Sequence, residues 1–238
     1  MRILVTGATG TLGRPVVEEL RARGHEVRAL SRRPHERQAG VTWFTDVRAA
    51  ADGVDVVVHA ASNTRRAGKG DVEMTRDLLR AAGGAHVIFV SIVGVDRLPM
   101  PYYKVKLAVE QLVAREAAHW TILRATQFHD LLRTMADVLA KSPVVPYLAR
   151  TNVQPVAVED VAVRVADLAE APPVEGRAPD FGGPDLWPVG ELFRVYLRSR
   201  KKHRLLVPVW LPGRLGRGLR AGYGTCPDHA DGKVPFVA

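Results

Sequence analysis

The chain has 238 residues, of which 47% are hydrophobic and 25% charged, a composition typical of a globular protein with one α/β domain. No apolar run approaches the roughly 18–20 residues that cross a bilayer, and the first residues already read as a strand, so we expect neither a membrane partner nor a signal peptide. The single cysteine, Cys226, excludes an internal disulfide and suits a reducing cytoplasm, where we expect the protein to reside.

Lysine and arginine outnumber aspartate and glutamate by 34 to 25, which gives a formal net charge of +9. Such an excess can indicate a nucleic acid partner. Apart from the run at residues 198–204, however, the basic residues are scattered, and no aromatic residues alternate with them. We therefore expect a small-molecule partner and disfavour nucleic acid, while the oligomeric state, monomer or homodimer, stays open.

The N-terminus carries the most informative pattern in the chain. A short apolar run at residues 3–5 is followed by Thr-Gly-Ala-Thr-Gly-Thr-Leu-Gly and then by an amphipathic helical pattern at residues 16–23. Gly7 permits a tight turn, Gly10 lets backbone N–H groups approach a pyrophosphate, and Gly13 lets helix and strand pack closely. The N-terminus of the helix adds partial positive charge where the phosphates would lie. The segment predicts a dinucleotide-binding turn whose members are Gly7, Thr9, Gly10, Thr11, Leu12 and Gly13.

Strand and helix patterns alternate through the first 140 residues. Further strands are predicted at residues 27–30, 41–44, 54–58, 86–90 and 120–123, and helices at 72–82, 103–115 and 128–140. Nearly continuous Val, Ile and Leu in strands that alternate with helices favour a parallel sheet covered on both faces. The predicted fold is therefore α/β, a Rossmann-type doubly wound sheet whose ligands bind at the carboxyl ends of the strands.

The last third of the chain has a different pattern. Proline and glycine become frequent after about residue 141, although helices are still predicted at residues 159–171 and 189–200. We interpret the chain as a single domain, residues 1–238, whose region at about 142–224 forms a small substrate lid. Residues 225–238 are polar and poorly patterned, which predicts a tail.

The end of the second predicted strand bears on the choice of cofactor. Dinucleotide folds usually place Asp or Glu about 20 residues beyond the glycines, but this chain has Ser31, Arg32 and Arg33 there. A carboxylate would repel a 2′-phosphate, whereas a guanidinium can hold it with paired charge-assisted hydrogen bonds. The sequence therefore favours NADP(H) over NAD(H).

Tyr102 and Lys106 stand four residues apart after the fifth predicted strand, so that on a helix they share one face. A phenol is a poor acid or base at neutral pH, and a nearby ammonium group favours the phenolate. Tyr102 could then exchange a proton with a carbonyl oxygen while hydride moves to or from its carbon, and Lys106 could hydrogen-bond the nicotinamide ribose.

The Gly-x-x-Gly-x-x-Gly turn and the segment PYYKVKLAVEQL resemble the short-chain dehydrogenase/reductase superfamily, in particular its extended and atypical, NmrA-like members. The resemblance covers about residues 1–165 and selects Tyr102, rather than Tyr103, as the phenol of a Tyr-x-x-x-Lys-x-x-x-Glu pattern. It implies that Asp46 contacts the adenine. It also implies that the backbone approaches the cofactor after the fourth strand. The further cofactor residues that the matching segments imply are Val47, Ala60, Ala61, Ser62 and Ser91.

The chain departs from this family at one catalytic position. Its VSIVG segment places Ser91 on the first serine of the family's Ser-Ser-x-x-Gly pattern and Ile92 on the second, catalytic one. Neighbouring strand positions face opposite sides, so Ser91 cannot simply replace the missing hydroxyl. By resemblance, Gln127 and His129 would lie near the substrate and could supply a donor, although His129 could equally face solvent at a helix start.

The sequence thus predicts an NADP(H)-dependent oxidoreductase that transfers hydride to or from a small organic carbonyl or conjugated substrate, with Tyr102 and Lys106 as catalytic residues. Ile92 also motivates a non-catalytic, NADP-binding redox sensor, and an isomerase or epimerase that retains its cofactor is a third possibility. Cys226, Asp228 and His229 make a poor metal site, so no metal is expected.

Overall fold

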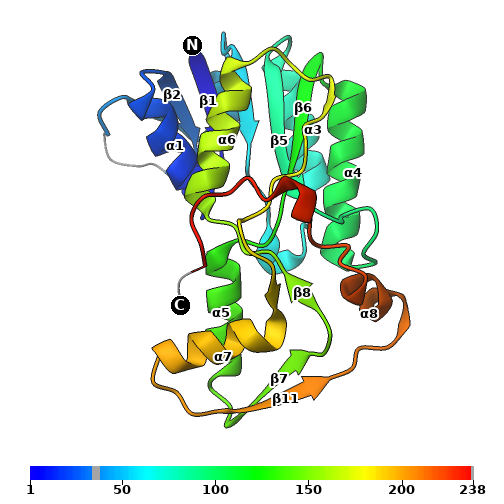
Figure 1. Ribbon diagram of the computed structural model, residues 1–238. Coiled ribbons are helices and arrows are strands. Elements are labelled where there is room, and N and C mark those ends of the chain that lie inside the picture. Colours follow the sequence, from blue (N-terminus) through cyan, green and yellow to red (C-terminus); the bar gives the residue numbers. More distant parts are fainter. Residues whose placement is uncertain (34–37, 237–238) are drawn as a thin grey trace. The chain divides into compact units, whose positions relative to one another are not determined.

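The structure is a computed structural model that describes residues 1–33 and 38–236 (Figure 1). It contains two compact units. The first comprises Met1–Ser91, Pro101–Arg124 and Val158–Pro179, and the second comprises Ile92–Met100, Ala125–Ala157 and Asp180–Ala238. Each unit is made of separate stretches of chain, and each has its own core.

A parallel sheet of seven strands organises the first unit. The strand order is β3-β2-β1-β4-β5-β6-β9. The bounds are β1 (Arg2–Thr6), β2 (Glu26–Leu30), β3 (Val41–Phe44), β4 (Val56–His59), β5 (His86–Ile92), β6 (His119–Ala125) and β9 (Gly176–Arg177). Because β1 pairs on one side with β2 and on the other with β4, the strand order reverses beside β1. This reversal is where open α/β sheets bind ligands.

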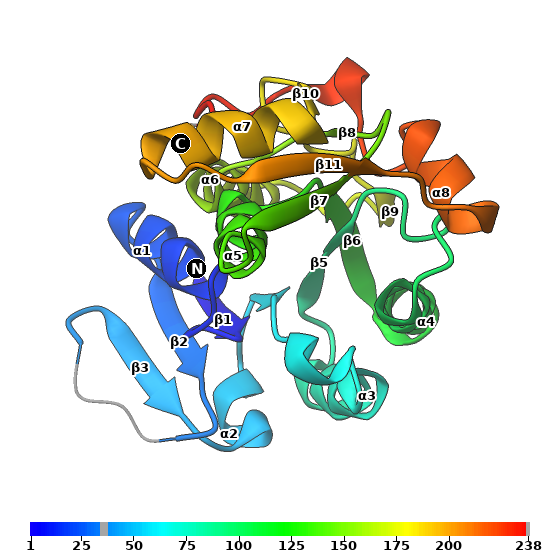
Figure 2. The same cartoon turned by 90° about the horizontal axis from the view of Figure 1, so that it is seen from below.

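Helices cover both faces of this sheet. On one face lie α2 (Val47–Ala51), α3 (Asp71–Ala82) and α4 (Pro101–Glu116), and on the other lie α1 (Gly13–Ala22) and α6 (Val158–Glu170) (Figure 2). A short 3₁₀ helix, Thr64–Arg66, precedes α3. Leu4, Val57 and Phe89 of the sheet are buried with Leu79 of α3 and Leu112 of α4 in one apolar cluster. This burial explains why the central strands read as nearly continuous apolar runs.

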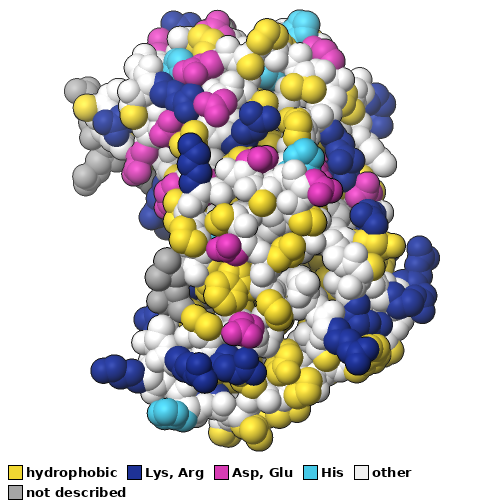
Figure 3. All heavy atoms as spheres, viewed as in Figure 1, with side chains coloured by type: hydrophobic (Ala, Val, Ile, Leu, Met, Phe, Trp, Pro, Cys, Tyr) yellow, Lys and Arg dark blue, Asp and Glu magenta, His cyan; other side chains and the backbone are white. Residues whose placement is uncertain are grey.

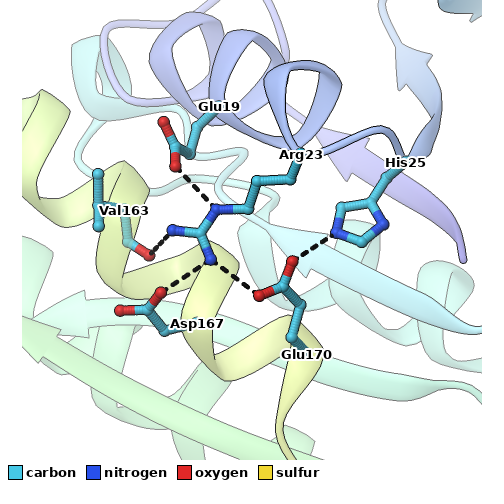
Figure 4. A network of polar contacts seen from close by, with 6 residues as sticks. All are labelled: Glu19, Arg23, His25, Val163, Asp167 and Glu170. Carbon is cyan, nitrogen blue, oxygen red and sulfur yellow. Dashed lines mark hydrogen bonds and ion pairs between the residues drawn. The ribbon is translucent and has the colours of Figure 1, made fainter.

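A charged cluster joins α1 to α6 within the first unit (Figure 4). The Arg23 guanidinium, just after α1, donates to Glu19 at 2.8 Å, to Asp167 at 2.8 Å and to Glu170 at 2.9 Å. Partial burial opposes the charged form, but these three hydrogen bonds outweigh it and raise the pKa of Arg23. His25 also contacts Glu170, at 2.9 Å, so the cluster closes around two carboxylates of α6.

The second unit is built on three helices and short strands. The bounds are α5 (His129–Leu139), α7 (Val189–Ser199), α8 (Gly213–Arg220), β7 (Val144–Leu148), β8 (Asn152–Val153), β10 (Trp187–Pro188), β11 (Leu205–Val209) and a 3₁₀ helix, Pro227–His229. β7 pairs in parallel with β11, and β8 pairs in antiparallel with β10. Leu132 of α5, Val145 of β7 and Phe193 of α7 share one buried core.

The structure confirms the predicted fold class, and every predicted strand and helix is present with ends that shift by up to three residues. The sequence analysis missed α2, β7, β8, β9, β10, β11 and α8. β7 and β11 contain Pro146 and Pro208, which argue against strands, and α8 contains three glycines, which lower helix propensity. No helix among the described residues is long and apolar enough to span a membrane.

The prediction of a tail at residues 225–238 needs correction for residues 225–236, which the structure describes. Cys226 and Phe236 are buried, and Phe236 belongs to the core of the second unit. Gly182 N donates to His229 O, and Gly232 N donates to Gly182 O, so backbone hydrogen bonds also hold this segment. Residues 237–238 lie outside the described residues. The expectation of one domain with a lid at about 142–224 stays a prediction.

Candidate functional site

The glycine turn closes between the carboxyl ends of β1 and β4. Gly7 has a φ of +68°, and a Cβ atom there would lie 2.8 Å from the backbone N of Ala61. A Cβ atom on Gly13 would lie 2.0 Å from Gly7 O. Both positions therefore exclude a side chain, because the contact atoms belong to the backbone and cannot move aside. That Ala60 and Ala61 let the backbone approach the cofactor stays a prediction.

This turn presents backbone donors at the start of α1. Gly10 N donates to Gly7 O at 2.8 Å, which tightens the turn. Within the described residues, the N–H groups of Thr11, Leu12 and Gly13 donate no backbone hydrogen bond. The first N–H groups of a helix lack partners inside it and carry its positive dipole. The turn thus fits an anionic group such as a diphosphate.

Two cations follow β2. Ser31 N donates to Phe44 O at 2.9 Å, and the Ser31 hydroxyl accepts from Arg33 N at 3.3 Å, so the strand end is held in place. Arg32 and Arg33 are exposed, and neither guanidinium has a partner among the described residues. Their charge is available to an anionic ligand at this end of the sheet.

Asp46 has a structural role that the sequence analysis did not consider. Its carboxylate accepts from Ala49 N at 2.8 Å and so caps the start of α2, whose first residue is Val47. The contact with adenine that the resemblance implies stays a prediction.

His59 is the last residue of β4 and is buried. Its ring nitrogens contact Thr6 Oγ1 at 2.7 Å and Thr75 Oγ1 at 2.9 Å. Burial, with a smaller effect of the charge on Lys106, lowers the pKa of His59 to about 3. The imidazole is therefore neutral at physiological pH and ties β1, β4 and α3 together.

A hydrogen-bonded chain joins Tyr102 to a buried carboxylate. Tyr102, on α4, lies 2.9 Å from Ser62 Oγ, and Ser62 donates to Asp71 Oδ2 at 2.5 Å. Because the Ser62 proton is engaged by the carboxylate, the phenol must donate to Ser62. Asp71 is buried at the start of α3 and also accepts from Asn63 N at 2.9 Å. The order Tyr102, Ser62, Asp71 therefore fixes where the phenol proton points.

Lys106 lies one helical turn beyond Tyr102 and is 5% exposed. Its Nζ donates to Val90 O at 2.7 Å and lies 3.9 Å from the centroid of the Phe89 ring. Burial lowers the pKa of Lys106 to about 8, although the charges of Asp71 and Glu110 oppose this change. The ammonium form of Lys106 therefore predominates at neutral pH, but its pKa lies only about one unit above that pH.

The electrostatics of Tyr102 correct one expectation of the sequence analysis. We expected the ammonium of Lys106 to favour the phenolate. In the structure, burial raises the pKa of Tyr102, the hydrogen bond with Ser62 opposes the rise, and the charge of Asp71 adds to it. Tyr102 is therefore protonated at neutral pH and suited to donate a proton.

The glutamate of the Tyr-x-x-x-Lys-x-x-x-Glu pattern stabilises the helix that carries the site. Glu110 binds Arg124 of β6 through two hydrogen bonds, from Nε at 2.9 Å and from Nη2 at 2.7 Å. Both side chains are almost fully buried. This bidentate pair anchors α4 on the sheet, and with it the face that holds Tyr102 and Lys106.

Ser91 and Ile92 end β5. Ser91 is 3% exposed, and its hydroxyl has no hydrogen-bond partner within the described part of the chain. A buried hydroxyl usually has a partner, so a ligand that reaches it would satisfy it. Ile92 is half-buried and offers no side-chain donor.

Gln127 and His129 belong to the second unit. The Gln127 amide donates to Gly224 O at 2.7 Å and accepts from Gln154 N at 3.1 Å, so its polar atoms hold the fold of this unit. His129 is 6% exposed and packs edge-on against Phe236 at 5.2 Å between ring centroids. The alternative that His129 faces solvent is therefore wrong.

Sequence reasoning missed Asp71. An acidic residue in the first turn of a helix is common, because it complements the helix dipole, so nothing local sets Asp71 apart. Only the approach of the segment after β4 to the start of α3 shows its contact with Ser62. Among the described residues, no group of three or more His, Cys, Asp or Glu side chains is arranged to hold a metal ion.

Comparison with known proteins agrees with the site. Residues 7–172 match the model of a family described as NAD(P)H-binding. The chain belongs to this NAD(P)H-binding family of atypical, NmrA-like short-chain dehydrogenase/reductases, as the resemblance indicated.

Curated relatives and solved structures extend this result. The chain is 30% identical over 243 residues to divinyl chlorophyllide a 8-vinyl-reductase of Zea mays, a match that covers 84% of this chain and 60% of that protein. The chain therefore spans about three fifths of the length of this relative.

Among solved structures, the NADPH-dependent quinone oxidoreductase QOR2 of Escherichia coli in complex with NADPH has a TM-score of 0.79 at 19% identity, with 94% of this chain and 91% of that one covered. A nucleoside-diphosphate-sugar epimerase from Staphylococcus aureus has a TM-score of 0.75 at 19% identity, covering 98% and 93%. At these identities the two structures establish the shared fold alone.

Proposed function

We propose that the protein is an NADPH-dependent reductase of an electron-poor double bond in a small organic molecule, a conjugated alkene or a carbonyl. The observation that carries the proposal is the chain Tyr102–Ser62–Asp71, which holds a protonated phenol in the same unit as the dinucleotide turn. Such a phenol keeps its proton at neutral pH, and once its O–H turns from Ser62 toward a bound substrate it can protonate that substrate as hydride arrives.

The residues of the first unit fit NADPH. The diphosphate would lie on the N–H groups at the start of α1, and the 2′-phosphate would lie on Arg32 or Arg33. Ser91 and Lys106 would hydrogen-bond the nicotinamide half. When bound, the cofactor supplies a hydride.

The proton step belongs to Tyr102 and its partners. Because burial keeps Tyr102 protonated, it enters the reaction as an acid. After the phenol has given up its proton, Ser62 can turn its own O–H from Asp71 toward the phenolate oxygen. Asp71 then keeps its hydrogen bond from Asn63 N. In this mechanism Ser62 and Asp71 position the phenol.

The substrate preference follows from Ile92. A carbonyl oxygen that develops negative charge needs a donor at this position, and an isoleucine has none. Reduction of a conjugated carbon–carbon bond depends less on such a donor near the reacting carbon. The vinyl reductase from Zea mays, by its name, acts on a carbon–carbon double bond, which supports the same preference.

Cofactor choice is tested by titrating the protein with NADPH and NADH and repeating the titration with Arg32→Ala and Arg33→Ala. We expect NADPH to bind at least about tenfold more tightly than NADH, and at least one variant to lose most of that difference. Arg48→Ala, which removes an exposed arginine of α2, is the matched control. Equal affinities for the two cofactors in the wild-type protein would refute the assignment of NADPH.

The role of Tyr102 is tested by NADPH oxidation with a panel of enones and quinones. Tyr102→Phe should lower kcat by about 100-fold or more and leave the Kd of NADPH unchanged. The neighbouring Tyr103→Phe removes a hydroxyl of the same kind and should retain activity. Ser62→Ala should lower kcat less than Tyr102→Phe, because it removes only the partner that positions the phenol.

Ile92 favours a second candidate, a non-catalytic sensor of the NADPH state. Such a protein would bind NADPH and oxidise it with no member of the panel. Ile92→Ser distinguishes the two, since it restores the family's hydroxyl and should raise turnover of carbonyl substrates only in a protein whose remaining catalytic groups are functional.

A further inference from the structure

The small sheet of the second unit has an apolar face that points away from its core. β7 and β11 are parallel, with Val144 opposite Leu205 and Leu148 opposite Val209. Alternate residues such as Val145 and Leu206 contact the core with α5 and α7. Since side chains alternate along a strand, the opposite face carries Val144, Pro146, Leu148, Leu205, Val207 and Val209.

This face, which we call the β7/β11 face, is exposed. Leu205 is 64% exposed, Val209 41% and Val144 40%. The space-filling view shows hydrophobic side chains on the surface along the edge where Figure 1 draws β7 and β11 (Figure 3). Exposed strands normally carry polar residues on their solvent side, so six apolar residues on one face indicate a binding surface.

The excess positive charge of the protein lies in the segment of chain that contains β11. Residues 192–227 contain nine lysines and arginines and no Asp or Glu. The rest of the chain has 25 basic and 25 acidic residues, so this segment accounts for the whole net charge of +9. The basic residues flank β11 on both sides, at residues 194–204 before it and at 214–220 in α8 after it.

Two features at the ends of β11 link the charges to the apolar face. Before the strand, a hollow of about 460 Å³ is lined by Arg194, Arg198, Lys202 and Arg204 together with His203, Leu197, Leu205 and Leu206. After the strand, Trp210 is 54% exposed, and the Arg220 guanidinium lies 4.1 Å from its ring centroid. The aliphatic residues of β11, the exposed Trp210 and the basic residues before and after them therefore follow one another in one continuous stretch of chain, residues 194–220.

We infer that the β7/β11 face docks on the surface of an anionic lipid bilayer. Aliphatic side chains and tryptophan enter the interface between headgroups and acyl chains, and Lys and Arg are attracted to anionic headgroups. Nucleic acid would engage the cations but would leave the aliphatic face in water. A second copy of this chain would oppose two faces of the same positive charge, which costs energy when both become buried.

This inference revises the expectation of no membrane partner only in part. That expectation rested on the absence of a segment that could cross a bilayer, and docking on a surface requires no such segment. The inference is also independent of the proposed reductase activity, because binding to vesicles is measured without substrate or cofactor.

The test is co-sedimentation of the 238-residue protein with vesicles of phosphatidylcholine alone and of phosphatidylcholine with phosphatidylserine. We expect strong binding only to the vesicles that contain phosphatidylserine, and weaker binding at high salt. The triple variant Arg198→Gln, Lys201→Gln, Lys202→Gln should lower the partition coefficient by at least about tenfold. The double variant Leu205→Ser, Val209→Ser should also lower it, while its remaining binding stays sensitive to salt.

Matched controls change the same residue types in the first unit. Arg48→Gln, Arg80→Gln, Arg115→Gln removes three exposed cations, and Met74→Ser, Val163→Ser removes two exposed apolar side chains. Both should bind vesicles like the wild type. Equal binding to neutral and anionic vesicles, or equal losses in control and test variants, would overturn the inference. Failure to bind vesicles combined with self-association, or with binding of duplex DNA, would also overturn the inference, since either result assigns the face to another partner.

Discussion

Lys106 shows how much one side chain depends on its surroundings. On the sequence it is a lysine of an amphipathic helix, but in the structure its ammonium group is enclosed between the Val90 carbonyl and the Phe89 ring. Its pKa falls to about 8 because the charged form loses water that these contacts replace only in part. Tyr102 changes in the opposite sense, since burial and Asp71 both raise its pKa.

The buried ammonium group of Lys106 should make the stability of the protein depend on pH. Its folded pKa of about 8 lies below the ordinary lysine value of 10.5, so between these values the unfolded chain binds a proton that the folded chain does not. Stability should therefore rise with pH through this window, by up to about 3 kcal/mol. Urea unfolding at pH 7.5 and 9.5 measures the rise.

Lys106→Met is the control for this prediction. The methionine keeps the length of the side chain and removes its charge, so the rise between pH 7.5 and 9.5 should disappear. If the variant shows the same rise as the wild type, the pH dependence comes from another group.

At the scale of elements, the turn between β1 and α1 is the part of the structure that the sequence predicts most directly. Gly7 and Gly13 are required by contacts with Ala61 and with Gly7 O, both of them backbone contacts. The glycine pattern can therefore be recognised in the sequence, because a residue with a Cβ atom would overlap the backbone at these positions. The anchoring of α4 by Glu110 and Arg124 is equally important but has no such local signature.

Gly13→Ala should disrupt both the turn and its donors. A Cβ atom 2.0 Å from Gly7 O forces the start of α1 to move, which should cost at least about 2 kcal/mol of unfolding free energy and abolish NADPH binding. Gly84→Ala is the matched control, because nothing lies within 4 Å of its added methyl group and its φ is not positive. We expect that control to change stability by less than about 1 kcal/mol and to bind NADPH normally. Calorimetry with and without NADPH checks both variants.

At the scale of the whole molecule, residues far apart in the sequence complete the two cores. The first unit takes α6 from beyond residue 157, and the second takes Phe236 from the end of the described chain. Phe236 contacts His129 of α5, more than one hundred residues earlier. The sequence analysis did not predict that Phe236 is buried, because the surrounding segment is polar and a single aromatic residue forms no periodic pattern. One aromatic side chain is nevertheless enough to hold a segment against a core.

Phe236→Ala tests whether the end of the chain is part of the core. Loss of a buried phenyl ring should destabilise the protein by about 3 kcal/mol, whereas a true tail would leave stability unchanged. Val234→Ala removes a side chain that is 43% exposed and should cost less than about 1 kcal/mol. Thermal unfolding of the two variants separates the outcomes. Equal melting temperatures for Phe236→Ala and Val234→Ala would show that this segment is a tail.

The amino-acid sequence by itself determined the doubly wound sheet, the position of the dinucleotide turn and the family. These properties depend on short-range patterns: apolar strands, helical periodicity and glycines whose spacing reflects backbone contacts. The tertiary structure alone decided that Ser62 joins Tyr102 to Asp71, that Lys106 is enclosed and that the β7/β11 face is exposed. Each of these depends on residues brought together from distant segments, and the environment of a side chain, which sets its pKa and its partners, follows from that assembly.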